Sequence, residues 1–406
     1  NGELEEAWHD WAAAVARIDA AAAWPNTNLM LGGNYLFSES GMKSWDRTTL
    51  TAGFDGMENL AWPSKTAQAA RVALDGAREA AEAFRAEKFA LQRRVLGEWL
   101  EYALLVERLR LRETELAIAT LLDASAAGRV AAGARAQDAL QARIEARMVQ
   151  DELASLRSEV SRAVARLNAT VGRPPDAPLP PPPLPEARPL LASDAELLAL
   201  GVAANPELAA LAQRVQGRDD ALELARRQYL PDINPVAMLQ GNVEWAAGAM
   251  VVLPTTRVEL SSMVQQAQAE LEGARALLRQ GRLDRTAAFV ATLAALRDAE
   301  RQRALFEGDV LPLAEGLSAD LGAAYATGGA ELMEMLDAER LVVQVREVIA
   351  EARIAREDSL AALEELLGLD AETLGPEAEA EAAAGAEAAT TAADTARTAR
   401  SGGDEP

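Results

Sequence analysis

A helical pattern of unusual length, residues 64–127, most constrains what this chain can fold into. Apolar side chains recur along it at steps of three, four or seven residues in two shifted sets: Leu96, Trp99, Ala103 and Val106, and then Leu105, Leu109 and Leu116. At ~1.5 Å per residue, a helix of about 65 residues is a rod of about 100 Å. Because two apolar seams require neighbours on two sides, the pattern indicates bundled, coiled-coil-like helices rather than one compact core.

Two long helical regions fold back on themselves at breaks rich in small residues. The first break carries Gly128 and Gly133. The second carries Gly328 and Gly329, and Pro312 upstream of it should kink the helix. Glycine reaches the left-handed backbone that commonly ends a helix, so both breaks are predicted to be the tips of helical hairpins.

Each hairpin is preceded by two short stretches in which strand character is expected. They are residues 28–37 and 48–57 in the first half, and residues 232–241 and 243–253 in the second. In the first pair, Leu29, Leu31, Tyr35 and Phe37 share one face. Two alternating runs across a short polar loop predict an antiparallel hairpin, and about 9–11 residues suffice for a tilted strand to cross a bilayer. The second pair is richer in Ala and Gly and alternates poorly.

The two halves repeat one order of elements: helix, strand, strand and long helical hairpin. The spacing supports a repeat, because Gly133 to Gly172 and Gly329 to Gly368 are both 39 residues. We therefore divide the chain into two repeats. The first repeat is 1–172, with its hairpin at 64–172 and tip at 128–136, and the second is 193–370, with its hairpin at 255–369 and tip at 326–331. A Pro-rich linker at 173–192 joins them, and an Ala/Glu-rich tail at 371–406 is predicted to be disordered.

Composition argues against several classes of function. The net charge of −23 and the lack of a basic stripe with interleaved aromatic side chains disfavour nucleic acid as a partner. The chain has no cysteine and a single histidine, His9, so no metal centre and no cofactor are expected. No phosphate-binding loop or nucleophile constellation is visible, so an enzyme is not expected. No run reaches ~18 apolar residues, so no transmembrane helix is expected, and no signal peptide is visible.

The backbone hydrogen-bonding groups at the sheet edges cannot all find partners within one chain. Four strands are too few to close a barrel around an aqueous lumen, and an open sheet edge is not tolerated in lipid. Three chains would supply about 12 strands, enough for an open barrel. The expected fold is therefore mainly α with a membrane β-barrel, in which three tandem-repeat protomers form a 12-stranded β-barrel and gather their hairpins into an α-helical barrel.

Several short motifs occur in a fixed order along the chain. They are the NPEL opening at Asn205, the AELMEMLDAER stretch from Ala330, and the repeat ends LNATVGRPP and LEELLG. With the tandem repeat, these motifs make the sequence resemble the TolC-like outer membrane factors, also called outer membrane efflux proteins, over residues 1–370. The strand exit Trp62-Pro63-Ser64-Lys65 most resembles the heavy-metal and cation efflux branch of that family.

The resemblance implies a homotrimer in the outer membrane of a Gram-negative cell, extending into the periplasm. It implies a passive export duct of a tripartite efflux or type I secretion system, without catalysis. The implied partners are outer membrane lipid, a periplasmic adaptor (membrane fusion) protein and an inner-membrane pump such as an RND or ABC transporter. Members of this family commonly carry a cysteine for lipid attachment, which this sequence lacks.

The second tip carries the strongest candidate site. Glu334 and Asp337 are three residues apart, which places them on one helix face. In a three-fold tube they would form two stacked rings of carboxylates, which favour cations at a narrow entrance. The resemblance implies that this pair lines the periplasmic constriction, and that Tyr325 and Asp138 tie neighbouring hairpins shut. The alternatives are a solvated helix face for the acids and ordinary coiled-coil packing for Tyr325.

The glycines at the tips have a structural role and an implied functional one. Their structural role is to permit the turns. The resemblance implies that the tips, with Gly128, Gly133, Gly328 and Gly329, contact the adaptor.

A second function remains open at this point. Long hairpins that pack side by side could also build a soluble structural or scaffold protein, with the alternating runs as small β-joints. Burial of Leu31, Tyr35 and Phe37 against lipid would count against that alternative.

Overall fold

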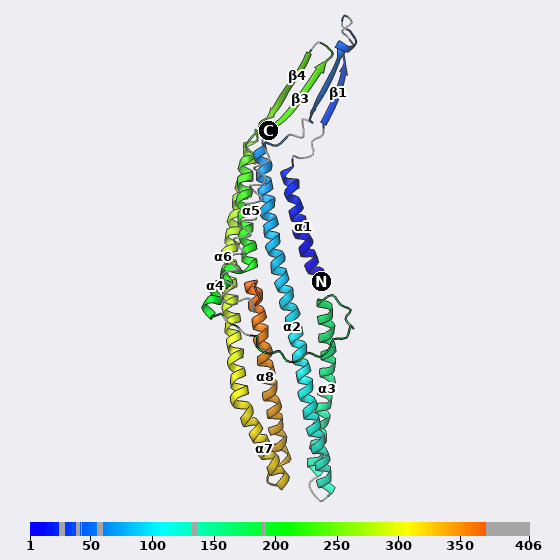
Figure 1. Cartoon of the computed structure of the whole chain (residues 1–406), viewed down its shortest axis with the longest axis vertical. Helices are drawn as coiled ribbons and strands as arrows, with labels where there is room; N and C mark the ends of the chain where they lie inside the picture. Colours follow the sequence, from blue (N-terminus) through cyan, green and yellow to red (C-terminus); the bar gives the residue numbers. More distant parts are fainter. Residues whose placement is uncertain are drawn as a thin grey trace. The chain divides into compact units, whose positions relative to one another are not determined.

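The computed structural model describes residues 1–23, 29–37, 41, 43–54, 60–131, 136–188, 190, 192–242 and 244–370. Helices dominate, and the strands form one sheet (Figure 1). The chain divides into two compact units, one with residues 1–2, 86–205 and the described residues from 285 onward, and the other with residues 3–85 and 206–284. Each unit takes segments from both halves of the chain, so the predicted repeat boundaries, which divide the sequence, stay a prediction.

The unit with residues 3–85 and 206–284 contains the sheet. Its strands are β1 (Leu29–Tyr35), β2 (Thr48–Phe54), β3 (Asp232–Gln240) and β4 (Glu244–Val252). They are antiparallel and lie in the order β1-β2-β3-β4, so the two predicted hairpins pair with each other through β2 and β3. The strand predictions are confirmed to within one or two residues at each end. Residues 28, 55–57 and 243 of the predicted strands lie outside the described residues.

Helices of the same unit lead into and out of the sheet. They are α1 (Gly2–Ala22), the beginning of α2 (Pro63–Ala131), α5 (Pro206–Arg227) and the beginning of α6 (Arg257–Leu305). An ion pair of 2.8 Å joins Lys65 Nζ in α2 to Asp232 Oδ1, the first residue of β3. Trp11 of α1 stacks on Phe84 of α2, with ring centroids 6.4 Å apart. The start of α2 is thereby tied to both the sheet and α1.

The other unit is a bundle of long helices. It holds the rest of α2 and α6, with α3 (Ala136–Thr170), α4 (Asp194–Ala204), α7 (Leu311–Thr327) and α8 (Leu332–Leu367). Its largest core packs α4, α6 and α8 together through Leu197, Phe289, Leu296, Leu360, Leu363, Leu366 and Leu367. Separate clusters follow along the helices, including one between α2 and α3 and one between α7 and α8. The packing is therefore distributed along seams, as two apolar stripes per helix predict.

The predicted kink at Pro312 is confirmed as an interruption of the helix. A π-helical turn, Phe306–Val310, separates α6 from α7, and Pro312 is the second residue of α7. Proline has no N–H to donate to the preceding turn and its ring crowds that turn, so the regular hydrogen-bond ladder is broken there.

One helical stretch passes a length and composition test for a membrane-spanning helix, although no run of ~18 apolar residues is present in the sequence. The helical stretch Asp194–Arg227 is long and apolar enough, by length and composition alone, to cross a membrane. In the structure Asn205 divides this stretch into α4 and α5. Within α5, Arg214 pairs with Glu79 and Arg218 pairs with Glu270, so this helix makes ion pairs with its neighbours.

The Pro-rich linker is held in place by buried charge. Arg188 Nε donates to Glu357 Oε2 and Arg188 Nη1 donates to Glu364 Oε1, both at 2.8 Å. The two carboxylate side chains of α8 are only 5% and 3% exposed. Arg356 Nη2 in turn donates to the backbone oxygen of Arg188 at 2.7 Å. A segment without helix or strand is thus fixed against α8 by charge-assisted hydrogen bonds.

Replacing Arg188 with alanine should lower the free energy of unfolding by about 3 kcal/mol, because two buried carboxylates lose the guanidinium between them. Urea denaturation followed by circular dichroism measures this change. Arg301→Ala is the matched control, since the pair between Arg301 and Asp298 is exposed and should be worth at most about 1 kcal/mol. Equal losses in the two variants would contradict the role of the linker contact.

Candidate functional site: the hairpin tips

The second tip is built as its glycines predict. Gly328 ends α7 in the left-handed conformation, with φ 80°. The Gly329 N–H donates to the Ala324 oxygen at 2.8 Å, and the Gly328 N–H donates to the Tyr325 oxygen at 3.1 Å. These two bonds satisfy carbonyl groups that the end of the helix leaves without partners. The turn at Gly328 and Gly329 is therefore confirmed.

Glu334 has a structural task that the sequence analysis missed. Its Oε2 accepts a hydrogen bond of 3.0 Å from the N–H of Glu331, the residue that caps α8. The Glu331 side chain in turn accepts from the backbone of Glu334, which completes a capping box. The spacing of three residues between two acids just before an apolar run is the signal that could have revealed it. Glu334 remains exposed at the surface of the tip.

Asp337 lies on the same exposed face as Glu334 and has a cation beside it. Arg340 Nη1 lies 3.4 Å from Asp337 Oδ1, one turn further along α8. Arg340 Nε also donates to Glu145 Oε1 of α3 at 3.1 Å. The hydrogen bond that Arg340 donates to Glu145, followed by the charges of Glu145 and Asp337, raises the pKa of Arg340 above its ordinary value. Arg340 therefore joins the first hairpin to the second close to the acidic pair.

Sequence reasoning did not single out Arg340 or Glu145. The spacing from Asp337 to Arg340 is a recognisable helical ion-pair spacing, so half of this link was visible in the sequence. The partner on α3 was not, because Glu145 and Arg340 are 195 residues apart in the chain.

Tyr325 is half-buried beside a hydrophobic cluster at the tips. The cluster joins α2, α3 and α8 through Leu122, Ala126, Ala142, Leu332 and Leu336. Packing is therefore part of what positions the tyrosine. The side chain of Asp138 and the whole of Gly133 lie outside the described residues, so the predicted tie between Tyr325 and Asp138 stays a prediction.

The first break begins later than the sequence indicates. Gly128 was expected at or near the first tip, and it lies near the tip but inside α2, which continues through it to Ala131. The Ser and Ala residues around it tolerate helix, and one glycine costs a helix only about 1 kcal/mol relative to alanine. A Cβ added at Gly128 would meet nothing within 4 Å, so no close contact requires a glycine there.

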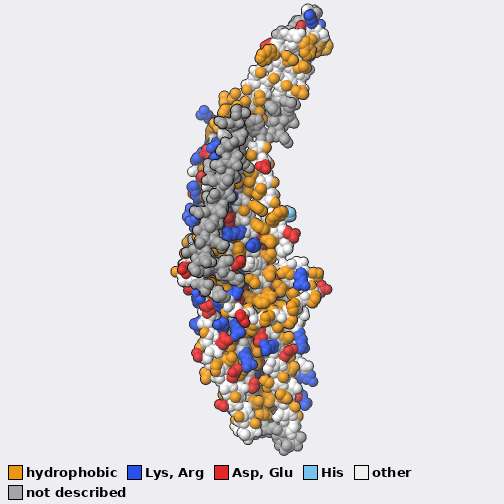
Figure 2. Space-filling model, in the orientation of Figure 1, with side chains coloured by type: hydrophobic (Ala, Val, Ile, Leu, Met, Phe, Trp, Pro, Cys, Tyr) orange, Lys and Arg blue, Asp and Glu red, His pale blue; other side chains and the backbone are white. Residues whose placement is uncertain are grey.

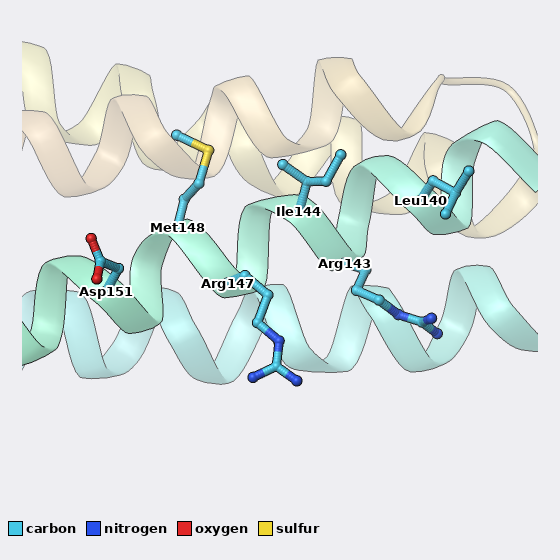
Figure 3. Close-up of a pocket in the computed structure, with 6 residues that line it drawn as sticks. All are labelled: Leu140, Arg143, Ile144, Arg147, Met148 and Asp151. Carbon is cyan, nitrogen blue, oxygen red and sulfur yellow. The ribbon is translucent and has the colours of Figure 1, made fainter.

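An apolar groove of about 360 Å³ follows the outer face of α3 (Figure 3). Its apolar side chains, Leu140, Ile144 and Met148, recur every four residues and are 59%, 59% and 55% exposed. Arg143 and Arg147 extend from the same stretch toward the opposite side from Ile144 and Met148. This face, Leu140 to Met148, is called the α3 stripe below.

A second exposed stripe lies on α7. Leu313 and Leu317, one helical turn apart, are 75% and 46% exposed, and Gly316 between them leaves open space. The acids Asp309 and Asp320 flank them on the same face, four residues before and three residues after, and both are exposed. This face, Asp309 to Asp320, is called the α7 stripe. The groove along the α3 stripe is thus apolar with two arginines and Asp151 beside it, and Arg143 lies 3.8 Å from Asp123 of α2. The α7 stripe is apolar with aspartates.

Comparison with solved structures identifies the fold. A membrane protein from Pseudomonas aeruginosa matches with a TM-score of 0.76 and 20% identity, covering 91% of this chain and 88% of that chain. The outer membrane protein VceC from Vibrio cholerae matches with a TM-score of 0.75 and 17% identity, covering 90% and 92%. The MtrE outer membrane channel of Neisseria gonorrhoeae matches with a TM-score of 0.72 and 17% identity, covering 91% and 86%.

The chain has a TolC-like fold. The resemblance noted in the sequence is therefore confirmed at the level of structure, and it extends over nine-tenths of the chain. No protein-family model matches the sequence, and the search of curated proteins returned no significant match. In the TolC-like fold, the helices that carry the two stripes and the acidic pair belong to one helical unit.

The two glycines of the tips should respond in opposite directions to alanine. Gly328→Ala should destabilise the protein by about 1 kcal/mol, because alanine is strained at positive φ. Gly128→Ala should stabilise it by about 0.5–1 kcal/mol, because it removes a glycine from the interior of a helix. Thermal denaturation of the two variants measures both changes. A loss of stability in Gly128→Ala would contradict a helical Gly128 and indicate that it belongs to the turn.

Proposed function

We propose that the chain is the outer membrane channel component of a tripartite efflux or type I secretion system, a passive homotrimeric export duct gated at its periplasmic tip. The observation that carries this proposal is the sheet, which exposes one continuous apolar face and two unpaired edges in a protein with a TolC-like fold.

The register makes one face of the sheet more apolar than the other. Paired residues such as Leu31 and Ala52, Leu50 and Leu239, and Leu239 and Trp245 fall on one face. That face is made of Leu31, Tyr35, Leu50, Ala52, Ile233, Ala237, Leu239, Trp245 and Val251, and Figure 2 shows hydrophobic side chains gathered over the strands. The opposite face is mixed. It carries the polar residues Asn34, Thr49, Thr51, Gln240 and Glu244, and also the apolar residues Met30, Val236, Met238, Met250 and Val252. Such a division suits a barrel wall with lipid outside and water inside.

The apolar face is too exposed for a surface that contacts only water. Leu31 is 77% exposed and Trp245 is 80% exposed, on strands at opposite edges of the sheet. An exposed apolar patch of this kind normally marks contact with a membrane or another protein. The outer edges of β1 and β4 pair with no other strand of the described chain. Three copies that join edge to edge would supply about 12 strands and remove every open edge.

The two helical stripes support the same assembly. The α3 stripe and the α7 stripe are different surfaces with complementary charge, so they suit each other better than either suits itself. A contact between two different surfaces of identical chains builds a ring or an open filament. Arg143 lies seven residues after the start of α3, and Asp320 lies seven residues before the end of α7. The opposite charges would therefore meet when both tips lie at the same level.

The gate is proposed at the tips. Three copies of Glu334 and Asp337 would ring the entrance, and Tyr325 with Asp138 would hold neighbouring hairpins together. Arg340, which contacts both Glu145 and Asp337, would supply a cation for the contacts that hold the hairpins together. The tips would meet the periplasmic adaptor, and an inner-membrane pump of the RND or ABC type would supply the energy. The heavy-metal and cation branch remains a prediction from the strand exit at Trp62.

The proposed location and assembly can be tested by fractionation. The full-length protein, expressed in a Gram-negative host with an export signal, should enter the outer membrane fraction and require detergent for extraction. Native mass spectrometry in detergent should then give a trimer. A protein that stays soluble without detergent as a monomer or dimer would overturn the channel and favour the soluble scaffold.

The proposed contact between the stripes can be tested with cysteines, because the chain has none of its own. The double variant Ile144→Cys/Leu317→Cys should form disulfides between copies and give covalent dimers and trimers but nothing larger. Each single variant is the matched control and should form no disulfide. Dimers from Ile144→Cys alone would show that α3 packs against α3, and they would contradict the proposed ring contact.

A further inference from the structure

Two carboxyl groups meet in the helices next to the sheet, far along the chain from the tips. Asp75 lies in α2 and Asp220 lies in α5, and both belong to the unit with residues 3–85 and 206–284. The Asp75 side chain is only 4% exposed. It faces the turn of α5 that leads to Asp220, because a Cβ added at Gly217 would lie 3.4 Å from the Asp75 Cβ.

The neighbours of the pair donate too few hydrogen bonds to satisfy two ionised carboxylates. Gln68 Nε2 donates to the backbone oxygen of Asp220 at 3.0 Å and to Asp220 Oδ1 at 3.1 Å. Arg78 Nη1 lies 3.3 Å from Asp75 Oδ1. Asp75 Oδ2 is buried and receives no hydrogen bond from a donor group in the described residues. A buried carboxylate oxygen without a donor is costly, and a proton on one of the two carboxyl groups removes that cost.

The arginines of α5 near Asp220 are paired with other acids, and Arg71, one turn before Asp75 on α2, is exposed. On α5, Arg214 pairs with Glu79 of α2 and Arg218 pairs with Glu270 of α6. Asp219 faces Arg275 of α6, with 3.7 Å between Oδ1 and Nη2. The charged groups that act on the Asp75 carboxyl are therefore Asp220 on α5 and Arg78 on its own helix.

We propose that Asp75 and Asp220 share one proton and form a pH-sensitive link between α2 and α5. At acid pH, Asp75 takes a proton from solvent and donates it in a hydrogen bond to the Asp220 carboxylate. At higher pH that proton returns to solvent, and two carboxylates face each other with Arg78 beside Asp75. Asp220 is only half-buried, so water can reach the pair and exchange its proton.

The electrostatics of the site agree with this assignment. Burial raises the pKa of Asp75 from 3.8 to about 6, the hydrogen bond and charge of Asp220 act in the same direction, and Arg78 opposes them. A carboxyl group whose pKa is higher in the folded state favours that state at low pH. The favourable contribution is complete below the unfolded value of 3.8, declines as pH rises, and is lost above about pH 6.

The expected size follows from the two pKa values. Between pH 5 and pH 8, the equilibrium constant for local opening of this region should rise about tenfold in the wild type. Hydrogen–deuterium exchange of the full-length protein, corrected for the intrinsic effect of pH on exchange, measures this constant in peptides that contain Gln68 to Arg78 and Arg214 to Asp220. The measurement does not depend on the proposed channel, so either proposal can fail alone.

The variant Asp75→Asn should remove the dependence on pH and should be better protected than the wild type at pH 8. Asp298→Asn is the matched control, since Asp298 also has an arginine three residues later but is exposed, and it should leave the pH dependence unchanged. If Asp75→Asn does not fold, Asp220→Asn is the second variant, and its amide can donate to Asp75 at every pH.

Infrared spectroscopy supplies a readout that a merely structural role would not change. The wild type at pH 5 should show a protonated carboxyl band that Asp75→Asn lacks. The proposal is overturned if the wild type shows no pH dependence, or if Asp75→Asn is less protected than the wild type at pH 8. Either result would make Asp75 an ordinary ionised partner of Arg78.

Discussion

A strand must find partners for the N–H and C=O groups along both of its edges, and the sheet of this protein leaves its two outer edges unpaired within the described chain. The face formed by Leu31, Leu50, Leu239 and Trp245 adds a second demand, since it is apolar and uncovered. A lipid surface and further copies of the chain meet both demands together. Along the chain, α2 follows β2 and α6 follows β4, and both continue as long helices.

Long helices cannot be stabilised by one central core. In this protein they are held by several small clusters in series, from the contact between α4, α6 and α8 to the cluster at the tips. Ion pairs between helices help to align them along the seams, and Arg340 with Glu145 is an example near the candidate gate. A rod built in this way can open at one end while its other clusters stay packed, which suits a gate at the tips. It also leaves faces such as the α3 stripe free for another copy.

Much of the fold was accessible from local patterns. The strands, the hairpin at Gly328 and Gly329, and the break at Pro312 each depend on residues within a few positions of one another, and each is confirmed. The end of α2 was missed because Gly128 is a turn-forming residue that a helix can still accept. The role of Glu334 in capping α8 was missed although its signal is local, because the acid was considered only as part of a charged face.

What the sequence determined by itself is the set of elements and the faces they present, since periodicity, proline and glycine act within one or two turns of the chain. Only the tertiary structure decided which faces meet. It brought Arg340 to Glu145 across 195 residues and placed Gln68 against Asp220 across 152 residues. It also buried Asp75 beside a second carboxyl group, where the same residue on an exposed helix would be an ordinary acid. Those pairings depend on distance in space and on exclusion of water, and neither is encoded in local spacing.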